Sequence, residues 1–261
     1  MVTIRILADD RIGEIRPRGL RAEHGFSVAV GDVLFDAGQT GVAAHNARRL
    51  TGDASYETIV LSHGHYDHTG GLPPFLDEAT TLFAHPDAFE PKYRDDSYIG
   101  IPYRREHVED AVDVVTHVDP VEVAPGIHAL GEIPRMARDN PLGETVNDAG
   151  ERVPDRIRDD QSLAVETGDG LAVICGCCHA GLRNTIEHAE AALDEPVRAV
   201  FGGTHLTALD EAAVHDVADW LQGRLDLLAP SHCTGHEAER ILADRFPGTV
   251  EFVGVGSEIE L

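Results

Sequence analysis

Three histidines and one aspartate fall within six consecutive positions, as His63, His65, Asp67 and His68. Imidazole and carboxylate groups are the ligands that zinc and similar divalent ions take in proteins. Because alternate residues of an extended chain point to the same side, His63 and His65 can bind one metal ion. Asp67 and His68 then face a second ion. A polar turn with ordinary surface histidines is the alternative, but this density of ligands after an apolar run favours a metal site.

The elements that must hold these ligands follow from the apolar pattern of the chain. Short strands are predicted in the first half at residues 1–7, 26–30, 33–35, 58–61, 81–84, 111–115, 121–123 and 127–130, with helical segments at 41–50 and 72–78. The second half alternates strands at 163–166, 171–175, 197–201, 225–228 and 249–253 with helices at 180–193, 209–221 and 237–246. Two halves of similar content predict an α/β fold, an αββα four-layer sandwich, in a single domain of residues 1–261.

A long polar stretch, residues 133–160, shows no usable periodicity and predicts an irregular loop that forms a lid or is partly disordered. It concentrates arginines that can hold a phosphate or carboxylate through two hydrogen bonds. A solvated loop that pairs with its own acidic neighbours is the alternative. The arginines are Arg135, Arg138, Arg152, Arg156 and Arg158.

The charge of the chain is strongly acidic: 46 Asp and Glu against 21 Lys and Arg give a net charge of -25, and Lys92 is the only lysine. Such a balance argues against nucleic acid as a partner. It suits a high-salt medium, in which counter-ions screen the self-repulsion. We therefore expect a halophilic source, and a small-molecule substrate that is anionic if the arginine-bearing loop holds it.

No apolar run reaches the length that spans a bilayer, and residues 1–7 lack the features of a secretory signal. These observations predict a cytoplasmic protein without membrane association. Three of the four cysteines crowd at Cys175, Cys177 and Cys178, too close for a disulfide framework. We expect reduced thiols that pack near the active site, with a separate zinc site as the less favoured alternative.

The His-x-His-x-Asp-His pattern after a strand resembles the hallmark of the metallo-β-lactamase superfamily. Phe35-Asp36-Ala37-Gly38 and Ala84-His85-Pro86 are similar to further strand ends of that family. Within it, residues 23–27, 176–181, 201–206 and 231–235 resemble the 7,8-dihydropterin-6-methyl-aminobenzene-ribofuranosyl phosphate synthase-like branch. The resemblance implies the same sandwich fold and a metal-dependent enzyme.

By this resemblance His179 and His232 are further metal ligands. The chain also departs from the family pattern, because the strand-end Gly-Asp of many superfamily hydrolases is here Gly176-Cys177. The usual bridging carboxylate is therefore missing. We expect His179 to coordinate near that point, while Cys177, Cys178 or Glu132 remain alternative sources of a ligand.

Three other side chains have two interpretations each. Asp36 either orients a ligand histidine or only forms a turn. His24 and His205 either stabilise a developing oxyanion beside the metals, as catalytic residues, or make structural hydrogen bonds. Asp67 is expected both to bind metal and to orient the attacking water.

Two divalent ions side by side can activate water against an electrophilic carbonyl or phosphorus, so hydrolysis of a small ester, lactone or phosphoester is the predicted function. Zinc is favoured, and manganese, iron or nickel would also suit such donors. A transferase related to pterin synthesis and a metal-binding sensor without turnover are the alternative functions. The oligomeric state is left open by the sequence.

Overall fold

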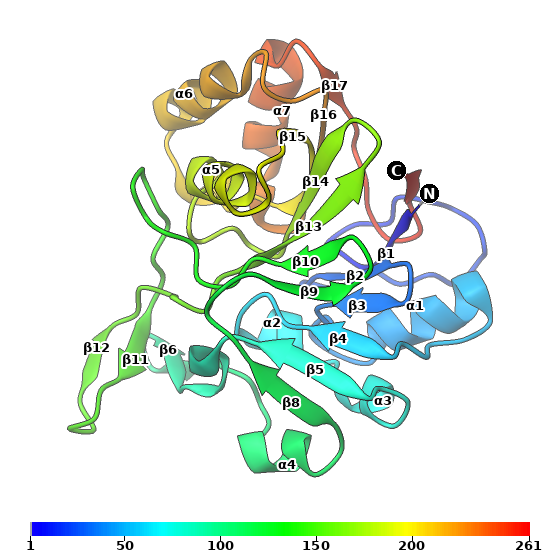
Figure 1. Cartoon of the computed structure of the whole chain (residues 1–261), viewed down its shortest axis with the longest axis vertical. Helices are drawn as coiled ribbons and strands as arrows, with labels where there is room; N and C mark the ends of the chain where they lie inside the picture. Colours follow the sequence, from blue (N-terminus) through cyan, green and yellow to red (C-terminus); the bar gives the residue numbers. More distant parts are fainter. Residues whose placement is uncertain (1) are drawn as a thin grey trace.

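Apolar strands build two facing sheets of seven strands each within residues 2–261, the part of the chain that the computed structural model describes (Figure 1). The first sheet has the order β18-β1-β2-β3-β4-β5-β8. Its strands are β1 (Thr3–Ala8), β2 (Ser27–Val30), β3 (Val33–Phe35), β4 (Thr58–Val60), β5 (Thr81–Ala84), β8 (Asp113–Thr116) and β18 (Glu258–Glu260). The second sheet has the order β17-β16-β15-β14-β13-β10-β9. Its strands are β9 (Val121–Ala124), β10 (Ile127–Ala129), β13 (Ser162–Thr167), β14 (Gly170–Cys175), β15 (Val197–Gly203), β16 (Leu227–Ser231) and β17 (Thr249–Val250).

Three apolar cores separate the layers of the molecule. Between the sheets, Phe26, Phe35 and Ile174 are among the side chains that are fully buried. Helices α1 (Val42–Thr51) and α3 (Pro73–Leu76) pack on a second core at the outer face of the first sheet. Helices α5 (Leu182–Leu193), α6 (Glu211–Leu221) and α7 (His236–Arg245) pack on a third core at the outer face of the second sheet (Figure 1). The architecture is the predicted αββα sandwich.

The carboxyl ends of parallel strands position the candidate ligands. In the first sheet β3, β4 and β5 are parallel; Asp36 follows β3, and the loop of His63 follows β4. In the second sheet β14, β15 and β16 are parallel, and they lead to Cys177, His205 and His232 respectively. Because neighbouring parallel strands end at the same edge of a sheet, their loops meet there.

The polar stretch 133–160 is not the irregular loop that the sequence predicted. It contains β11 (Glu144–Val146) and β12 (Arg152–Pro154), which form a four-stranded sheet with β6 (Lys92–Arg94) and β7 (Ser97–Tyr98). Figure 1 shows β11 and β12 as a hairpin that projects from the body of the molecule beside β6. The prediction was wrong because these strands are very short and pair with a segment distant in sequence.

The remaining differences from the sequence prediction lie at the ends of elements, in short helices and in one short strand. The predicted strand at 1–7 is observed from Thr3 on, and residue 1 lies outside the described residues. Strand β18 was not predicted, and β17 is shorter than the predicted strand at 249–253. The short helices α2 (Tyr66–Thr69) and α4 (Arg105–Glu109) were also missed. None of the helices within residues 2–261 is long and apolar enough to cross a membrane.

A buried ion-pair network ties the small sheet to the ligand loop. The amine of Lys92 in β6 donates to Asp155 Oδ2 at 3.1 Å and to Asp159 Oδ1 at 2.8 Å, and all three side chains are buried. The other oxygen of Asp159 accepts the backbone amide of Gly64 at 2.7 Å. A Cβ at Gly64 would lie 2.0 Å from the carbonyl oxygen of Ala88, so only glycine fits between the two histidines of this loop.

Candidate metal centre

The first set of candidate ligands is formed by His63, His65 and His179, whose ligand nitrogens lie within 4.8 Å of one another. The Nδ1 of His179 donates to the carbonyl oxygen of Asn140 at 3.0 Å, which leaves Nε2 with its lone pair and without a partner among residues 2–261. The Nδ1 of His65 lies 2.9 Å from the Nε2 of His63, so these two rings meet through those nitrogens. His63 contacts the hydroxyl of Ser62 through Nδ1 at 2.8 Å. Three buried imidazoles thus bring one nitrogen each to a common point.

The second set is formed by Asp67, His68 and His232. Asp67 Oδ2 lies 3.7 Å from the Nε2 of His68 and 3.6 Å from the Nε2 of His232. The Nδ1 of His68 donates to Asp36 Oδ2 at 2.7 Å, and the Nδ1 of His232 donates to Asp10 Oδ1 at 2.8 Å. In both rings the protonated nitrogen faces away from the cluster, as it does in histidines that bind metal.

The second set fits a metal ion by distance. Donors bound to one tetrahedral ion at roughly 2.0–2.3 Å are about 3.3–3.7 Å apart. The two distances from Asp67 Oδ2, 3.7 and 3.6 Å, match this spacing. The first set fits by donor chemistry, because the Nε2 of His179 is buried and has no hydrogen-bond partner among residues 2–261.

Burial keeps the first set of imidazoles neutral. It holds the pKa of His63 and His179 well below the ordinary value, and it lowers the pKa of His65 to about 4. Burial acts in the same direction on His68, but nearby carboxylates, led by Asp36, outweigh it and raise the pKa of that histidine. A neutral imidazole is the form that binds metal, so the first set is ready to coordinate near neutral pH.

Two carboxylates orient these rings, and only one was foreseen. Asp36 accepts the hydroxyl of Ser62 at 2.6 Å in addition to His68, so it has the orienting role that the sequence left open. Asp10 was missed; it contacts both His232 and, at 3.1 Å, the Nδ1 of His24. The signal that could have identified Asp10 is its position just after the first strand, because strand ends are where the side chains of a site are displayed.

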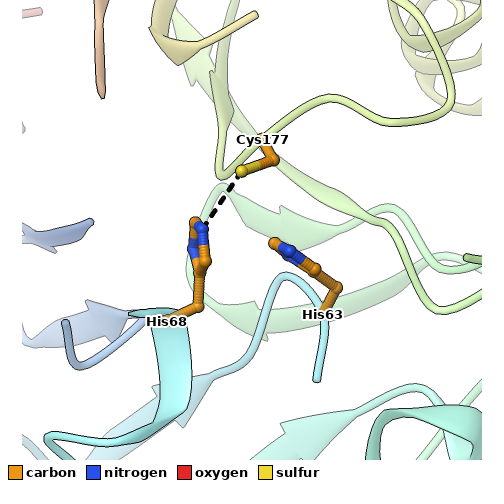
Figure 2. Close-up of side chains that lie close together, drawn as sticks. All are labelled: His63, His68 and Cys177. Atoms are coloured by element: carbon orange, nitrogen blue, oxygen red, sulfur yellow. Dashed lines mark hydrogen bonds between the residues drawn. The ribbon is translucent and has the colours of Figure 1, made fainter. Parts of the chain in front are cut away.

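Cys177 lies against the second set of ligands. Its Sγ is 3.2 Å from the Nε2 of His68 (Figure 2). It is 3.5 Å from the Nε2 of His232, and the side chain is buried. His179 lies instead in the first set, so it does not replace the missing carboxylate, as the sequence had led us to expect.

Cys178 and Glu132, which the sequence also offered as sources of the missing ligand, point elsewhere. The Sγ of Cys178 contacts the hydroxyl of Thr185 at 3.3 Å on the helix side of the sheet. Glu132 pairs with Arg158 at 2.8 Å and with His85 at 3.6 Å. Neither is among the groups of converging metal donors that residues 2–261 form.

His24 and His205 both line the cavity of about 810 Å³ into which the two ligand sets open. The Nε2 of His24 lies 3.3 Å from Asp67 Oδ2. The hydrogen bond between His24 and Asp10 raises the pKa of His24. The ring of His205 lies 4.4 Å from that of His179, measured between centroids. Burial lowers the pKa of His205 to about 4, and its Nδ1 has no partner among residues 2–261.

The arginines of the 133–160 stretch do not line this cavity. Arg135 donates to the carbonyl oxygens of His179 and Ile157, and Arg158 pairs with Glu132, so these two have structural partners. Two other arginines border the cavity, Arg11 and Arg94, and sequence reasoning identified neither of them as a site residue.

Only one of these two cavity arginines is free to meet a ligand. The guanidinium of Arg11 is held by Glu239 at 2.8 Å and by two backbone carbonyls. Arg94 is exposed and makes no side-chain hydrogen bond or ion pair with the described residues of the chain. Burial is the main influence on the pKa of two residues near Arg94: it raises the pKa of Tyr66 and lowers the pKa of His205. The positive charge of Arg94 has a smaller effect and lowers the pKa of both. Arg94 therefore acts on the same cavity.

The chain is similar to known proteins in both sequence and structure. Residues 25–176 match the family model of the metallo-beta-lactamase superfamily. The chain is 32% identical over 227 residues to the uncharacterized protein MJ0448 of Methanocaldococcus jannaschii, covering 83% of this chain and 86% of the relative. It is 29% identical over 222 residues to 7,8-dihydropterin-6-methyl-4-(beta-D-ribofuranosyl)-aminobenzene-5'-phosphate synthase of the same organism, covering 79% and 76%. Among solved structures, Tm1679, described as a metal-dependent hydrolase of the beta-lactamase superfamily, is similar with a TM-score of 0.89 and 30% identity, covering 100% and 99%.

Proposed function

The chain belongs to the metallo-beta-lactamase superfamily, and we propose that it is a hydrolase that uses two divalent metal ions against a small anionic ester, lactone or phosphoester. The observation that carries the proposal is the pair of buried donor sets, His63 with His65 and His179, and Asp67 with His68 and His232. Each set offers three donors that converge on one point, beside a cavity of substrate size.

Metal ions bound to the two sets would lower the pKa of a bound water, and their positive charge would stabilise the transition state. The protein holds the surrounding groups in place. Asp67 Oδ2 lies 3.7 Å and 3.6 Å from the two ligand nitrogens of its own set, so this carboxylate is placed to hold the same ion, and we propose that it also orients the attacking water. Zinc is the ion that we propose, because the donors are mainly imidazoles.

His24 and His205 are proposed to act on the substrate from the cavity wall. The raised pKa of His24 keeps a proton available beside Asp67, so this side chain can donate a hydrogen bond to the developing oxyanion. The lowered pKa of His205 keeps it neutral, so it can donate through one ring nitrogen without repelling the metal ions.

Arg94 supports the anionic part of the proposal. A guanidinium offers several donors to a phosphate or carboxylate, and this one borders the cavity without a partner among residues 2–261. The synthase to which the chain is 29% identical is named for a product with a 5'-phosphate, which agrees with a phosphate-bearing substrate. We therefore place a phosphoester first in the substrate panel.

The name of the same relative supports a second candidate function for this chain, a pterin-pathway transferase or synthase. In that case the metal ions would act on a leaving pyrophosphate group, and an organic nucleophile would replace water. A sensor that binds metal without turnover is the third candidate, since the usual bridging carboxylate is replaced by Cys177.

The test is metal analysis combined with an activity panel on protein purified in high salt. We expect about two transition-metal ions per chain in the wild type, as in other two-metal hydrolases, and a loss of metal and activity in His63→Ala and His179→Ala. Hydrolysis of a phosphodiester, phosphomonoester or lactone supports the hydrolase. Turnover only in a pterin condensation supports the synthase, and a fully loaded protein with no turnover supports the sensor. One ion or none, unaffected by His179→Ala, contradicts the two-metal proposal.

A further inference from the structure

A second cavity, of about 310 Å³, lies between helix α5, helix α6 and the segment 137–140. Both helices cover the outer face of the second sheet (Figure 1). No residue within 2–261 lines both this cavity and the cavity of the metal centre. The segment 205–209 separates the two, because His205 borders the metal cavity and the next residue, Leu206, borders the second one. The proposed hydrolase makes no use of this space.

Most of the wall of the second cavity is apolar, and it combines side chains of both helices with those of two loops. The apolar residues are Ala137, Leu182, Leu206, Leu209, Ala213, Val217 and Trp220. A concave apolar wall that includes a few polar groups is typical of a site for a small organic molecule. The polar groups therefore decide which kind of molecule fits.

One end of this cavity offers hydrogen-bond donors that have no partner within residues 2–261. Helix α5 begins at Leu182 without a side-chain cap from Gly181, and the backbone amides of Leu182, Arg183 and Asn184 donate to no described acceptor. The side chain of Asn140 borders the same cavity; the residue is only 9% exposed, and its amide group makes no hydrogen bond with the described residues. Buried amides are usually paired, and the start of a helix favours a negative charge. These donors together indicate a bound anion.

The charge of the cavity wall is opposite to that of the whole molecule. Arg138 and Arg183 line it against a single carboxylate, Asp216, although acidic residues outnumber basic ones 46 to 21 in the chain. The guanidinium of Arg183 is held by Glu187 at 2.9 Å, whereas that of Arg138 makes no hydrogen bond or ion pair with the described residues. Asp216 is exposed, so solvent and salt screen its charge. The cavity thus favours an anion that Arg138 can meet.

We propose that this cavity is a second binding site, and that its ligand is a small monocarboxylate with an apolar body. The carboxylate accepts hydrogen bonds from the side chain of Asn140 and from the free amides at the start of α5, and Arg138 supplies a positive charge. The apolar body packs against Leu209 and Trp220. The backbone carbonyl of Asn140 also accepts the Nδ1 of His179 at 3.0 Å, so the ligand rests against a residue that orients a proposed metal ligand.

The test is the fluorescence of Trp220, because this residue is the only tryptophan of the chain and it lines the cavity. Phenylacetate is titrated into the full-length chain in high salt. Phenylacetamide, which has the same shape without the charge, and acetate, which has the charge without the apolar body, are the matched probes. Arg138→Ala removes the free guanidinium, and Asn140→Asp places a negative charge where the ligand carboxylate binds.

Arg156→Ala is the control variant, since Arg156 is an exposed arginine of the same stretch that does not line the cavity. Circular dichroism checks that each variant is folded. We expect phenylacetate to change the Trp220 emission to saturation, with a Kd of about 10 mM or lower, the range for a ligand of this size. Binding should weaken by about 10-fold or more in Arg138→Ala and in Asn140→Asp, and stay unchanged in Arg156→Ala.

Both matched probes should bind at least about 10-fold more weakly than phenylacetate, because each lacks one half of the recognition. A wild type without a saturable change overturns the proposal. Equal binding of phenylacetate and phenylacetamide overturns it as well, and so does binding that Arg138→Ala or Asn140→Asp leaves unchanged. None of these results bears on the metal-dependent hydrolase, whose donor sets lie outside this cavity.

Discussion

At the scale of single residues, one arrangement recurs in the metal centre: His179, His68 and His232 are each held through Nδ1, which leaves Nε2 for a metal ion. A backbone carbonyl of Asn140 holds His179, and carboxylates of Asp36 and Asp10 hold His68 and His232. These partners determine the tautomer of each ring and its direction. The identity of the outer partner therefore matters to metal affinity almost as much as the ligand itself.

Replacing Arg94 tests the charge of the substrate. We expect Arg94→Ala to raise KM for a phosphate-bearing substrate by roughly 10- to 100-fold, the loss of about 1.5–3 kcal/mol for a hydrogen bond to a charged group. The value of kcat should change little, because Arg94 lies on the cavity wall and outside both donor sets. Steady-state kinetics on a phosphomonoester and a neutral lactone make the comparison.

Arg158→Ala is the control for this experiment, since that arginine pairs with Glu132 and does not line the cavity. Arg94→Lys keeps the positive charge, so it should raise KM for the phosphate-bearing substrate less than Arg94→Ala does. Equal losses in Arg94→Ala on the charged and the neutral substrate would count against an anion-binding role.

The lowered pKa of His65 makes the metal-free protein sensitive to acid. The folded pKa is about 4 and the ordinary value 6.5, so the folded state binds fewer protons than the unfolded state between these values. Stability is thus complete above pH 6.5 and is lost as the pH falls toward 4, by roughly 3 kcal/mol for this residue alone. The raised pKa of His68 acts in the opposite sense.

Urea unfolding of the metal-free chain at several pH values measures this loss. His65→Gln removes the titrating group while keeping a polar side chain, so its unfolding free energy should fall less between pH 7 and pH 4, values chosen to bracket the window of about 4–6.5. If the variant and the wild type lose stability in parallel, burial of His65 is not the cause.

At the scale of elements, strand ends bring the site together and a small sheet supports it. The ligands come from loops after β4, β14 and β16, and no single loop contains both donor sets complete. The four-stranded sheet of β12, β11, β6 and β7 adds Lys92, whose amine holds Asp159 and thereby the loop at Gly64. Arg94 lies in the same strand as Lys92, so this small sheet both supports the ligand loop and borders the cavity.

Lys92→Met tests that support. The substitution leaves the buried carboxylates of Asp155 and Asp159 without their cation, which typically costs about 3–5 kcal/mol. Denaturant unfolding in high salt should show this loss. Arg105→Met is the matched control, because it removes an ion pair with Glu109 that is exposed, and such pairs contribute about 0–1 kcal/mol. Similar small losses in both variants would show that the buried network does not stabilise the fold.

At the scale of the whole molecule, charge decides under which conditions the fold is stable. With a net charge of -25 the surface repels itself, and salt shortens the range of that repulsion from about 30 Å at 0.01 M to about 3 Å at 1 M. The carboxylates outnumber the basic side chains 46 to 21, so ion pairs cannot neutralise them all.

We therefore expect the melting temperature to fall when the protein is moved from about 1 M to about 0.01 M salt, with partial unfolding at the lower value. Circular dichroism melts across a dilution series give the dependence. A protein that stays fully folded with an unchanged melting temperature after dialysis would remove the main support for a halophilic source.

Much of the fold was predictable because its signals are local. Strand and helix periodicity indicated the αββα sandwich, and the loop from His63 to His68 carries four of the six proposed ligands within one segment. Similarity to a known family supplied His179 and His232, which no local spacing could have identified. The sequence by itself thus determined the fold class and the types of donor that the chain offers.

Only the tertiary structure decided how the distant parts meet. It placed Cys177 between the donor sets, joined Asp10 to His232 across the whole chain, and turned Arg94 toward the cavity. It also showed that the predicted arginine loop is paired with its own surroundings. These contacts join residues far apart in sequence, and they depend on strand pairing and side-chain direction. Neither property leaves a periodic signal in the chain, so the sequence specifies which groups are present but the packing determines which of them touch.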